Sequence, residues 1–157
     1  MRVLLAIDGS PHSEVAVAQV ARRPWPKGTA VEVLTVLHAA IPMLMEPTLV
    51  IAAAHVEQTE DLRKRAHEIV RSAADEIGNG TAELVVTTNI LEGSPKDVIV
   101  EEARNWNADL IVLGSHGYGR LKRMLLGSVA GAVVANAPCS VQVVRAKELL
   151  HPSPQPD

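Results

Sequence analysis

Four glycines in the second half of the chain mark the segment best suited to chemistry. Gly114, Gly117 and Gly119 follow an aliphatic run, and Gly127 stands with Ser128 at the start of a helical pattern. Glycines let a ligand approach backbone N–H groups closely, and a helix start presents free N–H groups and the positive end of its dipole. The spacing therefore predicts an anion site, with phosphate as the simplest occupant. The alternative is that the glycines only form a tight turn and allow close helix packing.

Two familiar phosphate motifs do not fit this segment. Gly114 and Gly119 have the spacing that opens a P-loop, but Arg120 and Leu121 stand where the P-loop needs Lys and Ser or Thr. The turn after the first aliphatic run, residues 8–10, lacks the GxGxxG pattern of dinucleotide folds. A P-loop is therefore excluded, and NAD is disfavoured.

The elements that must position these glycines alternate along the chain. Five aliphatic runs predict strands at 3–7, 31–37, 82–91, 110–113 and 141–144. Helical patterns lie between them, from Pro11 to before Pro24, over 62–77 with Gly78 as the expected C-cap, from Pro95 to Trp106, and over 128–136. Alternating strands and helices predict a single-domain α/β fold with an open parallel sheet and helices on both faces.

Two segments do not follow this alternation. Residues 41–54 have no clear period and contain two prolines, so we expect a mobile flap or a helix extension there. Residues 147–157 are rich in proline and predict a disordered tail after a domain spanning 1–146.

Composition limits the class of partner. The 157 residues are 47% hydrophobic and 21% charged, enough apolar material for an ordinary core. Aromatic residues make up 2% and the net charge is -3, which disfavours nucleic acid and anionic membranes as partners. The single cysteine, Cys139, and the absence of a signal-like or membrane-length apolar run predict a soluble cytoplasmic protein.

Several segments together resemble the universal stress protein family. The resemblance rests on the spacing Gly114-x2-Gly117-x9-Gly127-Ser128, on Asp8 after the first strand, on the phrase at 108–117, and on the closing segment 137–141. It extends from Val3 to Arg145, and the order of the segments matches throughout.

This resemblance implies a fold, a ligand and an assembly. The fold is the five-stranded parallel sheet of the adenine nucleotide alpha hydrolase-like type, in the order 3-2-1-4-5. The intact glycine motif is that of the ATP-binding branch, with Mg²⁺ or Mn²⁺ held through the phosphates. Many members form homodimers through the last strand, here 140–145, whose exposed edge has no proline or inward charge to prevent pairing.

The resemblance also assigns roles to individual positions. Gly117, Gly127, Ser128 and the backbone of Val129 would surround the phosphates, Leu113 and Gly114 would lie along the ribose, and Asp8 with the backbone of Val36 would address the adenine. Ala6 stands where some binders have proline, and we expect the Asp8 carboxylate to lie away from the phosphates because like charges repel.

The roles of other residues of the motif stay open. His116 could contact a phosphate, or it could simply pack in the loop. Of Arg120, Lys122 and Arg123, at most one is expected on the ligand. No nucleophile, general base or metal carboxylate can be assigned, and no paired histidine spacing predicts a metal site. The sequence therefore favours a nucleotide-dependent sensor or switch in the stress response, with a slow ATPase or an interaction protein with a vestigial site as alternatives.

Overall fold

The computed structural model describes residues 1–38, 49–80, 84–117 and 126–145. Five parallel strands form one sheet in the order β3-β2-β1-β4-β5. The strands are β1 (Arg2–Ala6), β2 (Ala30–Leu37), β3 (Val85–Glu92), β4 (Leu110–Gly114) and β5 (Ser140–Val144). The helices are α1 (Pro11–Arg22), α2 (Leu49–Gly80), α3 (Pro95–Asn105) and α4 (Ser128–Asn136). The predicted fold class and strand order are thereby confirmed.

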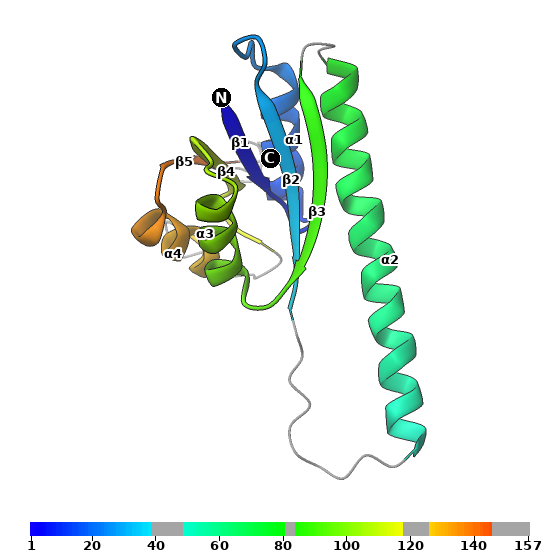
Figure 1. Cartoon of the computed structure of the whole chain (residues 1–157). Helices are drawn as coiled ribbons and strands as arrows, with labels where there is room; N and C mark the ends of the chain where they lie inside the picture. The colour runs from blue at the N-terminus through cyan, green and yellow to red at the C-terminus, as the bar shows by residue number, and fades with distance from the viewer. Residues whose placement is uncertain (39–48, 81–83, 118–125, 146–157) are drawn as a thin grey trace, which may run out of the picture.

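Helices cover both faces of the sheet, with α1 and α2 on one side and α3 and α4 on the other (Figure 1). Val3 and Leu5 of β1 belong to the core cluster under α1 and α2, whereas Leu4 and Ala6 belong to the cluster under α3 and α4. Because successive side chains of a strand point to opposite faces, a strand buried on both faces must be apolar throughout. The continuous aliphatic runs of the sequence have this cause.

The helix α2 differs from the sequence prediction at both ends. It begins at Leu49, so residues 49–54 are a helix extension, while the rest of the expected flap lies outside the described residues. It ends at Gly80, and Gly78 is not its cap. A Cβ at Gly80 would collide with the Ala21 carbonyl, whereas Gly78 has open space, so close packing of α2 against α1 requires glycine at position 80 and not at position 78.

The packing face of α2 is shorter than its periodic pattern. Ala66, Val70, Ala73 and Ile77 are buried, but Leu62 on the same stripe is 48% exposed. The N-terminal part of α2 runs past the end of the sheet (Figure 1), which explains why the stripe loses its partner there. Within the described ranges, no helix is long and apolar enough to cross a membrane. The predicted tail and the basic side chains 120, 122 and 123 lie outside these ranges.

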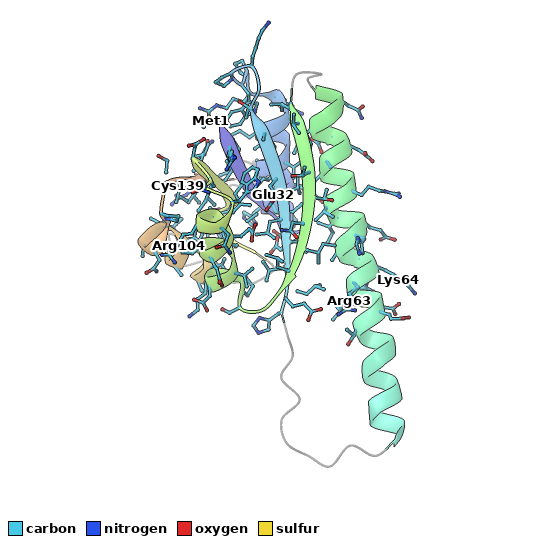
Figure 2. All side chains as sticks on the ribbon, viewed as in Figure 1. Met1, Glu32, Arg63, Lys64, Arg104 and Cys139 are labelled. Atoms are coloured by element: carbon cyan, nitrogen blue, oxygen red, sulfur yellow. The ribbon has the colours of Figure 1, made fainter. Side chains whose placement is uncertain are left out.

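One acidic side chain lies inside the molecule. Glu32 of β2 is 7% exposed, and Figure 2 shows it in the interior between the sheet and α3. Its Oε1 atom is buried and has no hydrogen-bond partner among the described residues. Burial raises the pKa of Glu32 above 4.5, and the neighbouring charge of Glu102 raises this pKa further, while a hydrogen bond with Asn89 lowers it.

This raised pKa makes stability depend on pH. The folded protein favours protonated Glu32, so its stabilising contribution is complete below pH 4.5 and is lost as pH rises through the folded-state pKa. We expect Glu32→Gln to increase the free energy of unfolding by about 1 kcal/mol at pH 7, since the amide carries no charge and can donate to Glu102. The gain should shrink toward pH 4.5 in urea titrations. A variant less stable than wild type at pH 7 would contradict this prediction.

Candidate functional site

A cavity of about 460 Å³ lies at the carboxyl ends of the central strands. It lies where the strand order reverses, because β1 has β2 on one side and β4 on the other, with their connecting helices on opposite faces. Parallel α/β sheets bind ligands at such a switch point. The residues that line it are Ala6, Ile7, Asp8, Ser13, Leu34, Val36, Pro95, Ile99, Leu113, Gly114, His116, Gly117, Gly127, Ser128, Val129 and Ala130.

All ten candidate residues from the sequence lie on this one cavity, although they come from segments far apart in the chain. Their role in binding a ligand stays a prediction. The cavity also contains residues that sequence reasoning missed, among them Leu34, Pro95 and Ile99. Leu34 lies two positions before Val36 on β2, and Pro95 and Ile99 are one helical turn apart, so strand and helix periodicity could have found them.

The cavity has an apolar side. Leu34 and Val36 of β2, Ala6 of β1 and Leu113 of β4 belong to or pack against the cluster that includes Ile99 of α3. Aliphatic side chains from three strands and a helix form a surface suited to a flat, weakly polar group, because such a group loses little by leaving water there.

The polar side is formed by the glycine loop and the start of α4. Ser128, Val129 and Ala130 form the first turn of α4 and line the cavity. Their N–H groups precede the first helical bond, which Gly131 N–H donates to the Gly127 carbonyl at 2.8 Å. No described side chain caps this helix, because its N-cap is Gly127. Free N–H groups therefore face the cavity, as an anion site requires.

The three described glycines of the motif differ in what they permit. Gly117 has no left-handed φ, and a Cβ there would lie 2.6 Å from Asp8 Oδ2, the movable end of a side chain. At Gly114 a Cβ would lie 2.9 Å from the His12 carbonyl carbon and oxygen, which are backbone atoms. At Gly127 it would lie 3.2 Å from the Ser115 carbonyl oxygen. Close packing against backbone thus accounts for Gly114 and Gly127, as the alternative interpretation of the motif expected, whereas the close neighbour of Gly117 is a side chain.

Asp8 lies nearer to the glycine loop than the sequence argument assumed. Its Oδ1 accepts a hydrogen bond from Ser10 N–H at 3.0 Å, which holds the carboxylate at the turn before α1. Its Oδ2 faces the space beside Gly117. Asp8, which was expected beside the adenine, and Gly117, which was expected beside the phosphates, are therefore close neighbours in this structure.

His116 is half-buried between the glycine loop and two helices. Its Nδ1 lies 3.2 Å from Ser115 Oγ, and its ring is tilted against that of His12 at a centroid separation of 5.4 Å. Ser115 is buried and accepts at its carbonyl from Gly127 N–H at 2.8 Å. Sequence reasoning did not bring His12 to the site, although its place in the first turn of α1 is a signal for it.

Metal ligands are few on this part of the protein. Among the described residues, no group of three or more His, Cys, Asp and Glu side chains could hold a metal ion. The lining residues include no lysine or arginine within the described ranges. Backbone N–H groups, the hydroxyl groups of Ser13 and Ser128, and His116 are therefore the donors that the described lining residues contain.

The fold and the cavity define an open α/β domain of the doubly wound type, with a candidate anion site at its switch point. The pattern of the universal stress protein family matches residues 1–145, and this chain belongs to that family. A Staphylococcus aureus relative that carries the family name is 32% identical, over 94% of this chain and 85% of its own.

Solved structures share the fold. The hypothetical protein MJ0577 has a TM-score of 0.80 and 27% identity, with 93% of this chain and 96% of that chain covered. A universal stress protein solved in complex with cAMP has a TM-score of 0.65 and 23% identity, covering 92% and 96%. An Arabidopsis thaliana member of the family with AMP bound has a TM-score of 0.60 and 17% identity, covering 98% and 97%.

Proposed function

We propose that this protein binds ATP in the switch-point cavity and acts as a nucleotide-dependent sensor or switch in the stress response. The observation that carries the proposal is the uncapped start of α4 facing the same cavity as the glycine loop. An apolar slot beside an anion site fits the two halves of a nucleotide. The structures of relatives with cAMP and AMP support an adenine nucleotide, and the choice of ATP is ours.

Different residues would contact the adenine and the phosphates of the ligand. The apolar side would hold the adenine, with the backbone of Val36 and the Asp8 carboxylate as its polar contacts. The N–H groups at Gly117, Ser128 and Val129 would hold the phosphates, and Gly127, whose own N–H is bonded to the Ser115 carbonyl, would let them approach closely. When bound, Mg²⁺ or Mn²⁺ would neutralise phosphate charge and would be held mainly by the phosphates.

Binding is tested by two measurements on the purified protein. Small molecules released on denaturation should include an adenine nucleotide, and calorimetry should show tighter binding of ATP than of adenosine, because adenosine cannot use the anion site. If neither ATP nor any released nucleotide binds at millimolar concentration, the motif is vestigial and the interaction-protein alternative replaces the proposal.

The rate of ATP hydrolysis distinguishes a switch from an enzyme. Among the described lining residues Asp8 is the single carboxylate, and no group of three or more His, Cys, Asp and Glu side chains in the described ranges could hold a metal ion, whereas fast phosphoryl transfer uses several positioned groups. We therefore expect the isolated protein to hydrolyse ATP far below the ~1–10³ s⁻¹ of typical enzymes. Release of labelled phosphate at tens per second, lost on substitution of Gly117, would make the ATPase alternative the better one.

The proposal includes a homodimer formed through β5. β5 is an edge strand. The side chains of Val141 and Val143 are half-buried against the core cluster under α3 and α4. An unprotected edge of this kind favours pairing with a second copy, which would satisfy its outward backbone groups.

A further inference from the structure

Two histidines lie side by side where the cavity meets the glycine loop. His116 lines the cavity, and His12 lies in the first turn of α1 with its ring centroid 5.4 Å from that of His116. The rings are tilted by 52°, so they pack against each other without stacking face to face. Both side chains are half-buried, so each is partly reachable by solvent protons.

The backbone fixes this pair. The His12 carbonyl packs against Gly114, where even a Cβ would not fit, and so α1 is held against the end of β4. On the other side, the Cα of His116 lies 3.3 Å from the position of a Cβ at Gly127, which places the histidine against the start of α4. His116 is thus part of the wall of the candidate anion site, and His12 packs directly behind it.

The charges around the pair favour a change of protonation on binding. A helix N-terminus disfavours a nearby positive charge, and α1 and α4 both begin beside the pair. The charged side chains on the neighbouring segments are Asp8 before α1, Glu14 in its first turn and Arg145 after β5. A bound phosphate group adds negative charge close to the rings and reverses this preference.

We infer that His12 and His116 make the affinity for the phosphate part of the ligand depend on pH, with tighter binding in acid. The inference rests on the proposed function and concerns the regulation of the same site. Histidine is the side chain whose ordinary pKa lets its charge change between pH 5 and 8. Because binding and protonation are linked, a ring that gains a proton on binding strengthens binding as pH falls.

The test is calorimetry of ATP and adenosine with the full chain at pH 5.5, 6.5 and 7.5. In the wild type, affinity for ATP should rise about tenfold from pH 7.5 to 5.5, as a charge-assisted contact provides. Adenosine affinity should stay constant because adenosine has no phosphate. ATP itself titrates in this range. The quantity to compare is therefore the slope of ATP affinity against pH in the wild type and in each variant.

The variants are His116→Gln, His12→Gln and the matched control His67→Gln, an exposed position on α2. We expect the first two to flatten the pH dependence of ATP binding, and the control to keep the wild-type slope. If His116→Gln fails to fold by circular dichroism, His12→Gln carries the test, because His12 does not itself line the cavity. Equal slopes in wild type and folded variants would overturn the inference while leaving ATP binding intact. Loss of ATP binding in the wild type at every pH would overturn the proposed function and the inference with it.

Discussion

Gly117→Val should weaken ATP binding at least about 100-fold, a loss of roughly 2.7 kcal/mol, while the protein stays folded. The valine would fill the space beside the loop where a phosphate must approach the backbone N–H groups. Folding should survive because Gly117 is exposed, has no left-handed φ and, among the described residues, has the end of the Asp8 side chain as the close neighbour of an added Cβ. Calorimetry gives the affinity, and circular dichroism and thermal unfolding report the fold.

The matched control is Gly131→Val on α4, where a Cβ would meet nothing within 4 Å. It introduces the same side chain close to the site but away from the proposed phosphate position, so its ATP affinity should stay near wild type. Unchanged ATP affinity in a folded Gly117→Val variant would contradict the proposed position of the phosphates beside this loop.

Val143→Pro should convert the expected dimer into a monomer. Ser115 N–H donates to the Val144 carbonyl at 2.8 Å, so Val144 faces β4, and by alternation Val143 directs its N–H outward. Proline there removes a donor from the free edge and leaves the ladder to β4 without a lost bond. Light scattering at high micromolar concentration should show about twice the mass of the 16.8 kDa chain for wild type and a single chain for the variant.

Two further substitutions distinguish the loss of pairing at the free edge from damage to β5 itself. Val143→Ala keeps the outward N–H and should remain dimeric, since main-chain bonds would form the seam. Gln142→Pro instead removes a donor that faces β4, so it should lower the unfolding temperature. A monomeric wild type would contradict the assembly.

Local patterns identified most of the elements because their causes are local. Ser10 illustrates this for helix starts, since its Oγ accepts from Ser13 N–H at 3.3 Å as an N-cap with Pro11 at the first position predicts. Ser94 also precedes a helix and a proline, but its side chain makes no capping bond, and its carbonyl accepts from Asp97 and Val98 instead. The start of α3 was therefore predictable, although the acceptor for its first backbone N–H groups was not.

The sequence by itself determined the alternation of strands and helices, the two-sided burial of β1 and the glycine spacing, because these follow from side-chain period and backbone freedom within short segments. Family resemblance added the strand order and the ten site residues. Only the tertiary structure decided which distant atoms meet: Asp8 beside Gly117, His12 beside His116, and Glu32 facing Glu102 from another layer. Such contacts depend on how the crossovers bring segments together, and so no period along the chain encodes them. The same holds for Gly80, where the approach of the Ala21 carbonyl leaves no room for a Cβ.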